Sequence, residues 1–196
     1  MILEKEIQFI LALDALKKVE RRNFNLDDSR RENTAEQSWQ IVVFAQVLLP
    51  YAKNKDQIDL LRVIRMLSIH DVVEIEAGDT FIFDERAMTG KYERELQAAK
   101  KTFGILNEPL SSDFINLWIE FEAEETPDAI FAYAVDRIMP FFLNVYGSAK
   151  SWTEADVKLN QVENIVGKAV RRASDEMGEA FDVLLKKAFD QGKLVE

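Results

Sequence analysis

The chain of 196 residues lacks cysteine, which removes disulfide bonds, thiol catalysis and thiolate metal ligands from consideration. It has a single histidine, so a transition-metal site that uses imidazole has to use His70. Glycine (7 residues) and proline (4 residues) are scarce, and this favours long helices over many short strands joined by turns. No apolar run approaches the length of a membrane span.

Basic residues are outnumbered: 25 lysines and arginines face 35 acidic residues, and the formal net charge is −10. A surface of this sign repels phosphate backbones, which argues against nucleic-acid binding, whereas local arginines can still hold a small phosphorylated substrate. Charges at Glu4, Lys5 and Glu6 interrupt the apolar stretch that a signal peptide needs. With the lack of cysteine, these features predict a cytoplasmic protein that does not associate with membranes.

The remaining composition is typical of a globular domain, with 47% hydrophobic and 31% charged residues in a chain of one-domain length. Apolar residues recur at helical spacing along most of the chain, which predicts an all-α fold. Residues 20–33 and 79–89 are expected to be loops. The expected helices cover residues 2–20, 34–50, 56–78, 91–103, 113–124 and 127–143, with one or two more within 152–192, interrupted near Gly167 or Gly178.

Helix boundaries are signalled at several positions. Thr34 and Gln37 have the spacing of a capping box, with Gln37 reaching back to the first turn. Thr126 is expected to cap a helix that has Pro127 in its first turn. Pro140 lies inside that helix and predicts a kink or a break, because an interior proline costs about 3 kcal/mol.

His70 and Asp71 form a dyad of two residue types that both ligate divalent cations. Consecutive side chains on a helix point about 100° apart, so both can hold one ion only in the crevice between them. Glu74, one turn further on, overhangs the same crevice, and the helix is expected to stop at Gly78. One helix cannot complete a coordination shell. The remaining ligands of a metal site therefore have to come from other helices. Without such ligands, an isolated His-Asp pair is more often an ordinary surface or core feature.

Other stretches accompany the dyad in a fixed order. They are residues 31–39 (Arg-Glu-Asn-Thr-Ala-Glu-Gln-Ser-Trp), 70–79 (His-Asp, then Glu74 and Gly-Asp), 121–127 (Phe-Glu-Ala-Glu-Glu-Thr-Pro) and 134–144 (Ala-Val-Asp-Arg-Ile-Met-Pro-Phe-Phe-Leu-Asn). Together they resemble the HD-domain metal-dependent phosphohydrolases, in particular the YfbR-like 5′-deoxynucleotidase subgroup. The resemblance covers about the first three quarters of the chain. A bare His-Asp pair is a weak signal, whereas four matching blocks in order are a specific one.

The resemblance implies a single HD-type domain over residues 1–196, a helical bundle of about seven to nine helices. Its metal-site core would lie at about 21–144, with C-terminal helices at 152–192. The implied activity is a metal-dependent phosphohydrolase that releases phosphate from nucleoside 5′-monophosphates, in particular deoxynucleotides. A metal-activated water would attack phosphorus, a reaction that depends on neutralising phosphate charge. A homodimer is implied by the resemblance only.

The family's metal ligands carry over residue by residue to His70, Asp71 and Asp136. The family's first histidine corresponds to Gln37, whose amide oxygen is a weaker, neutral donor. One divalent cation is therefore expected, Mn²⁺, Mg²⁺ or Co²⁺, rather than Zn²⁺ or Cu²⁺. Gln37 either ligates this cation, caps its helix, or hydrogen-bonds to a neighbouring ligand. The alternative function is a catalytically weakened relative that binds a nucleotide or a partner.

The resemblance also implies roles around the metal. Glu74 would orient or deprotonate the attacking water. Asp79 would contact the substrate or its water network, and Arg21 or Arg22 would hold the phosphate. Each residue has an ordinary explanation as well: Asp79 can order the turn after Gly78, and the arginines can form surface ion pairs, which contribute little.

Overall fold

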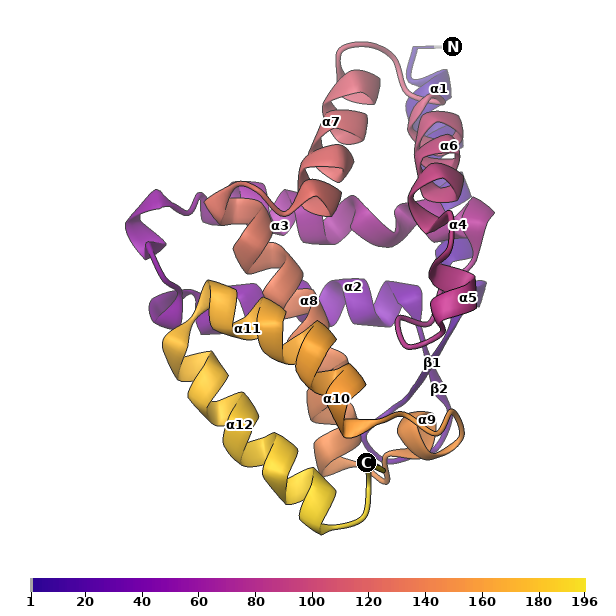
Figure 1. Cartoon of the computed structure of the whole chain (residues 1–196). Helices are drawn as coiled ribbons and strands as arrows, with labels where there is room; N and C mark the ends of the chain where they lie inside the picture. Colours follow the sequence, from indigo (N-terminus) through magenta and orange to yellow (C-terminus); the bar gives the residue numbers. More distant parts are fainter. Residues whose placement is uncertain (1) are drawn as a thin grey trace.

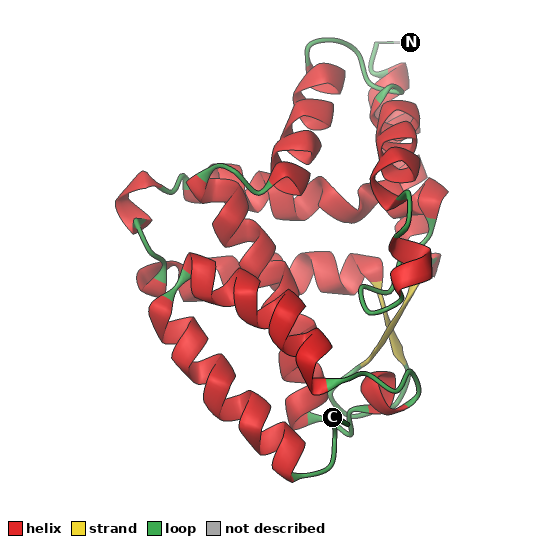
Figure 2. Cartoon of the chain, viewed as in Figure 1, coloured by secondary structure: helices red, strands yellow, loops and turns green. Residues whose placement is uncertain are grey.

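The computed structural model describes residues 2–196 (Figure 1). The chain folds into α-helices with one short β-hairpin, which confirms the predicted all-α class (Figure 2). Seven of the described α-helices have nine or more residues, within the expected number. Across residues 2–196, no helix combines the length and apolarity needed to cross a membrane.

The elements follow one another along the chain with short connections. The longer helices are α1 (Glu4–Ala12), α2 (Thr34–Leu48), α3 (Leu60–Ile69), α6 (Lys91–Phe103), α7 (Leu110–Ala123), α8 (Pro127–Tyr146) and α12 (Asp175–Asp190). The shorter ones are α4 (Glu74–Ala77), α5 (Glu85–Met88), α9 (Lys150–Thr153), α10 (Leu159–Val162) and α11 (Lys168–Ala173). The strands are β1 (Glu20–Phe24) and β2 (Arg31–Asn33).

Three helices form the centre of the molecule. α2 and α3 lie side by side, α8 packs against both, and α11 packs on α8 (Figure 1). The buried apolar residues fall into two clusters, and α8 contributes to both: Val135 belongs to the first, with α2, α3 and α7, and Ile138 to the second, with the C-terminal helices. Asp136, on α8 between these positions, therefore lies near the junction of the two cores.

The expected loop over residues 20–33 is wrong, because this segment forms the hairpin of β1 and β2. Charged and turn-forming residues dominate the segment and hide its two-residue alternation. That alternation turns Arg21 and Asn23 inward, while Arg22 between them is exposed. The hairpin thus presents two polar side chains to α8, which it contacts.

The capping box of α2 lies one residue earlier than expected. Asn33 is the N-cap: its Oδ1 accepts a hydrogen bond from Glu36 N at 3.0 Å, and Glu36 Oε2 accepts one from Asn33 N at 3.2 Å. Asparagine is preferred over threonine as an N-cap residue, which explains why Asn33 and not Thr34 caps α2. The interpretation of Thr34 and Gln37 as the capping pair is therefore wrong. Gln37 instead points into the interior and is fully buried.

The expected helix over 56–78 is shorter and divided. α3 begins after Asp59, whose carboxylate accepts hydrogen bonds from Leu61 N and Arg62 N. It ends at Ile69 and is followed by a 3₁₀ turn over His70–Val73 and then by α4. The segment stops at Gly78 as expected, with φ 75° but ψ 157°, so this glycine is not in the left-handed helical conformation.

The helix start at Pro127 is confirmed. Thr126 Oγ1 accepts a backbone hydrogen bond from the first turn of α8 at 3.2 Å. α8 continues through Pro140 to Tyr146, so the alternative of a break at this proline is wrong. The expected loop over 79–89 contains one helical turn, α5.

Between residues 159 and 190 the α-helical path is interrupted twice: by a π-helical turn that ends at Gly167, one of the two glycines proposed from the sequence, and at Ser174, which caps α12. A Cβ at Gly178 would lie 2.7 Å from Arg171 Cγ, and one at Gly167 would lie 2.8 Å from Phe181. Both glycines therefore permit close packing between α11, the π-helical turn before it (Glu163–Gly167) and α12.

Candidate metal centre and adjacent pocket

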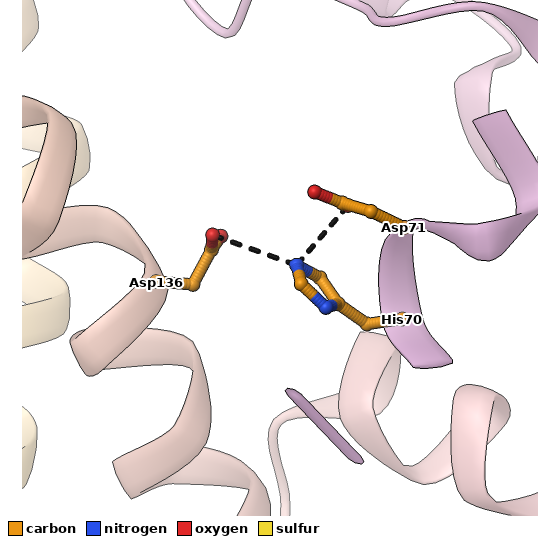
Figure 3. Close-up of side chains that lie close together, drawn as sticks. All are labelled: His70, Asp71 and Asp136. Atoms are coloured by element: carbon orange, nitrogen blue, oxygen red, sulfur yellow. Dashed lines mark ion pairs between the residues drawn. The ribbon is translucent and has the colours of Figure 1, made fainter. Parts of the chain in front are cut away.

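His70, Asp71 and Asp136 meet in the interior of the protein (Figure 3). His70 and Asp71 lie in the 3₁₀ turn after α3, and Asp136 lies in the middle of α8. His70 Nε2 is 3.1 Å from Asp71 Oδ1 and 3.5 Å from Asp136 Oδ1. One potential ligand atom from each residue lies within 4.8 Å of the other two, which is close enough for a single ion.

A backbone carbonyl orients the His70 ring. His70 Nδ1 lies 3.0 Å from the carbonyl oxygen of Leu67, in the last turn of α3. A carbonyl only accepts, so Nδ1 carries a proton and Nε2 faces the two carboxylates. Phe121 packs against the imidazole with ring centroids 4.7 Å apart. The atom presented to a metal is therefore Nε2.

The carboxylates change the protonation of His70. Burial alone would lower the pKa of His70, but the charge of Asp71 and hydrogen bonding to Asp136 outweigh it and raise the pKa to about 10. Burial alone would raise the pKa of Asp136, but Arg137 and His70 hold it well below its usual range. A proton on Nε2 thus occupies the place of a cation, and metal binding has to release it.

Gln37 belongs to the same cluster. Its Nε2 donates a hydrogen bond to Asp136 Oδ1 at 2.5 Å, while its Oε1 is buried without a hydrogen-bond partner. Of the alternatives for this residue, the structure contains the hydrogen bond to a neighbouring acidic residue. Exchange of the amide nitrogen and oxygen, which differ little in shape, would instead turn the oxygen toward the centre.

The donor set fits a divalent cation. Gln37 Oε1 is buried without a hydrogen-bond partner among the described residues, and His70 Nε2 faces two carboxylates. Leaving a buried polar atom unpaired costs about 1–3 kcal/mol, and a bound cation would remove that cost. One imidazole, two carboxylates and an amide oxygen suit a hard or borderline ion such as Mn²⁺ or Mg²⁺.

Glu74 is buried one turn after His70, at the start of α4. Thr34 Oγ1 donates a hydrogen bond to Glu74 Oε2 at 2.8 Å. Thr34 therefore holds this carboxylate instead of capping α2. Burial and the charge of Asp71 raise the pKa of Glu74 well above its usual value. This carboxyl group therefore holds a proton more readily than an exposed glutamate does.

Arg21 connects the hairpin to the centre. Its Nη1 donates to Asp71 Oδ2 at 3.0 Å and lies 3.7 Å from Asp79 Oδ1, while its Nε lies 3.8 Å from Glu32 Oε2. Arg22, the next residue on β1, is exposed. The structure therefore distinguishes the two arginines that the sequence leaves equivalent.

A pocket with about 480 Å³ of empty space, partly open to solvent, adjoins this cluster. Arg21, Asp79 and Arg137 line it, and Arg22 and two asparagines contribute further polar groups. The apolar part of the lining consists of Phe81, Ile82, Phe83, Pro140, Phe141, Trp152 and Val166.

Two charged residues at the centre were given no role from the sequence. Arg137 Nη2 lies 3.3 Å from Asp136 Oδ2, and its guanidinium stacks on Tyr133 at 4.6 Å. Glu32 is buried, and this burial raises its pKa to about 7. Both lie inside stretches that carry the family resemblance, so the signal was present, but in sequence they look like ordinary surface charges.

Comparison with known proteins agrees with these observations. The sequence profile of the HD domain family matches residues 13–178. The chain is similar to the human 5′-deoxynucleotidase HDDC2, with 28% identity over 132 residues, 67% of this chain and 62% of the human protein. The zebrafish (Danio rerio) protein of the same name is 23% identical over 137 residues, 69% of this chain and 66% of that protein. The match thus spans less than two thirds of either relative.

Two solved structures are also similar. One is a predicted metal-dependent phosphohydrolase from Magnetospirillum magnetotacticum MS-1, with 38% identity and a TM-score of 0.93 over 99% of this chain and 96% of that one. The other is an HD-domain phosphohydrolase from Listeria innocua, with 16% identity and a TM-score of 0.59 over 94% and 85%, which shows likeness of fold only. Since the family profile matches most of the chain, this protein belongs to the HD domain family.

Proposed function

We propose that this protein is a metal-dependent phosphomonoesterase that releases phosphate from nucleoside 5′-monophosphates, in particular deoxynucleotides. The observation that carries the proposal is the contact between the His70–Asp71–Asp136 group and a pocket lined by Arg21 and Arg137. Relatives named 5′-deoxynucleotidase support the substrate class.

The protein's own groups supply what phosphoryl transfer requires. A divalent cation held by His70, Asp71 and Asp136 would neutralise phosphate charge and lower the pKa of water. Arg21 and Arg137 add two positive charges for the oxygens on which charge develops. Burial opposes their charge, but the surrounding carboxylates outweigh it and raise the pKa of both guanidinium groups.

Glu74 is our candidate for the group that accepts the proton of the attacking water. Thr34 fixes one of its oxygens, and its raised pKa favours proton uptake. Asp79, 3.7 Å from Arg21, would orient this arginine and contact the substrate. Arg22 at the open side of the pocket would bind the phosphate more weakly than the less exposed Arg21.

The alternative is a weakened relative that binds nucleotide without turnover. The observation in its favour is that Gln37 donates to Asp136 through its amide nitrogen, which draws on the lone pairs of a metal ligand. In that case the protein would bind nucleotides but would not hydrolyse them with any divalent ion.

Metal analysis followed by a nucleotide panel separates the two functions. We expect the purified protein to release inorganic phosphate from nucleoside 5′-monophosphates with Mn²⁺, Mg²⁺ or Co²⁺, and Asp71→Ala to abolish this release. Nucleotide binding without phosphate release, together with release by Gln37→His, would show that the natural chain is the weakened relative.

We also propose that the chain forms a homodimer through the outer face of α2. Trp39, Val43 and Val47 recur every four residues there and are 70%, 39% and 62% exposed. No charged residue occurs from Gln37 to Ala52, so two copies of the chain can meet there without bringing like charges into contact. Sedimentation analysis should find a dimer, and Val43→Glu should convert it to a monomer; a monomeric parent would refute this contact. The cytoplasmic location stays a prediction.

A further inference from the structure

We infer that Asn23, held by Asn144 and Ser151, donates a hydrogen bond to the nucleoside part of the substrate and so selects nucleotides over smaller phosphate esters. The inference rests on the proposed phosphatase function and adds a residue that determines specificity. Asn23 and Asn144 both line the pocket beside the metal centre, and neither belongs to the metal-binding group.

The three side chains form a buried polar network. Asn144 Nδ2 donates to Asn23 Oδ1 at 3.2 Å and to the Pro140 carbonyl at 2.9 Å. Ser151 Oγ lies 2.6 Å from Asn144 Oδ1 and 3.2 Å from Asn23 Oδ1, and can donate its single hydrogen to either. The exposed fractions are 8% for Asn23, 4% for Asn144 and 3% for Ser151, so the network is shielded from water.

This network determines which way the Asn23 amide faces. Both hydrogens of Asn144 Nδ2 point at oxygens, one of them a backbone carbonyl that cannot donate. The neighbouring atom of Asn23 therefore has to be its oxygen. Within residues 2–196 the Asn23 side chain forms hydrogen bonds only through Oδ1, so the two hydrogens of its Nδ2 are left for the pocket that Asn23 lines. A buried amide with free donors, fixed in direction by its neighbours, is suited to bind a ligand oxygen.

The position of Asn23 fits the length of a nucleotide. Arg21 and Asn23 point inward from alternate positions of β1, about 7 Å apart along a strand. A phosphate at Arg21 would leave the sugar and base to extend toward Asn23. Phe141 and Trp152, which line the same pocket with ring centroids 5.9 Å apart, offer apolar surface to that part of the ligand. The acceptor is therefore a sugar oxygen or a base carbonyl.

The test compares a nucleotide with a small ester. For Asn23→Ala we expect kcat/KM for a deoxynucleoside 5′-monophosphate, relative to that for p-nitrophenyl phosphate, to fall about tenfold, the effect of losing one neutral hydrogen bond. The loss should fall on KM. Ser151→Ala, which loosens a positioning residue, should lower the same ratio by a smaller factor. Asn116→Ala, an exposed asparagine on α7, is the matched control and should leave the ratio unchanged.

Asn23→Asp serves if the alanine variant does not fold. It keeps the oxygen that accepts from Asn144 and Ser151 but cannot donate, and its added charge affects both substrates. The ratio should again fall. Deoxyribose 5-phosphate identifies the acceptor: a loss that includes this substrate assigns a sugar oxygen, and a loss confined to base-containing substrates assigns a base carbonyl.

An equal effect on all substrates, or none, would overturn the role of Asn23 while leaving the phosphatase proposal intact. If the parent protein hydrolyses neither nucleotides nor p-nitrophenyl phosphate with any of the metals, the proposed function fails. In that case, binding still tests Asn23. The quantity measured is the affinity for a nucleoside 5′-monophosphate divided by the affinity for inorganic phosphate, and an equal value in the parent and in Asn23→Asp would overturn the role of Asn23.

Discussion

The metal centre consists of charged side chains, whereas the far side of its pocket consists mainly of neutral polar and aromatic side chains. At the centre, His70, Asp71, Asp136 and Arg21 are ionisable and shielded from solvent to differing degrees, and the charges of their neighbours in this group shift the pKa of each. Across the pocket, neutral amides and aromatic rings take their place. The two regions therefore suit different parts of a nucleotide. Charge is concentrated where a phosphate would react, and neutral hydrogen bonds, which discriminate without attracting every anion, lie where a nucleoside would be recognised.

The largest effect should come from the charged side. Asp136→Asn removes a negative ligand while keeping the shape of the side chain, and we expect a loss of at least about 1,000-fold in kcat/KM, because a metal ion contributes several kcal/mol to catalysis. Steady-state kinetics and metal content measure the effect. An unchanged metal content with full activity would remove Asp136 from the centre.

Arg21→Lys tests whether charge alone suffices at the junction of the two regions. Lysine keeps the charge but cannot contact Asp71, Asp79 and Glu32 through one planar group, so we expect a loss of about 10- to 100-fold in kcat/KM. Arg22→Lys, on the exposed side of β1, is the matched control and should cost less. If both variants behave alike, the distinction between the two arginines is wrong.

Gln37→His should strengthen the charged side. It supplies a second imidazole and removes the amide that donates to Asp136, so we expect the affinity for Mn²⁺ or Co²⁺ to rise about tenfold. Calorimetric titration measures the change. Gln40→His, on the same helix, controls for a histidine that merely adds a surface site, and it should have no effect.

The last effect concerns the stability of the metal-free protein, not its activity. The pKa of His70 is raised from 6.5 to about 10, so its contribution is complete below pH 6.5 and is lost as pH rises toward 10. The free energy of unfolding should therefore fall over this window, by at most about 1.4 kcal/mol per pH unit. Denaturant titrations in chelator measure it. His70→Gln should flatten the profile, and an equally steep profile in that variant would assign the dependence to other groups.

The sequence was a good guide where one strong signal acted alone. The start of α8 follows from Thr126 and Pro127, and α6 has the predicted bounds, 91–103. It was a poorer guide where two signals competed. Asn33 and Thr34 are both N-cap residues, and the choice between them moved Gln37 from a cap to the interior. In the hairpin, charged residues conceal an alternation that becomes visible only when β1 pairs with β2.

In the candidate site, too, the sequence indicated some residues and missed others. The order of the motifs brought His70, Asp71 and Asp136 to attention, but whether they bind metal is still a proposal. Periodicity could not reveal that Arg137 lines the same pocket as Arg21, nor the pairing of Asn23 with Asn144, because both depend on how the hairpin packs against α8. Contacts of this kind follow from tertiary packing, which local patterns do not encode.

The bond between His70 Nδ1 and the Leu67 carbonyl has a practical consequence. Because the chain has one imidazole, a sample labelled with nitrogen-15 at histidine alone contains only two ring signals, and both come from this site. The Nδ1 signal should keep a proton in every state, anchored by the end of α3. The Nε2 signal should exchange its proton for a metal. A single spectrum would thus report how a helix terminus selects the nitrogen that meets the ion.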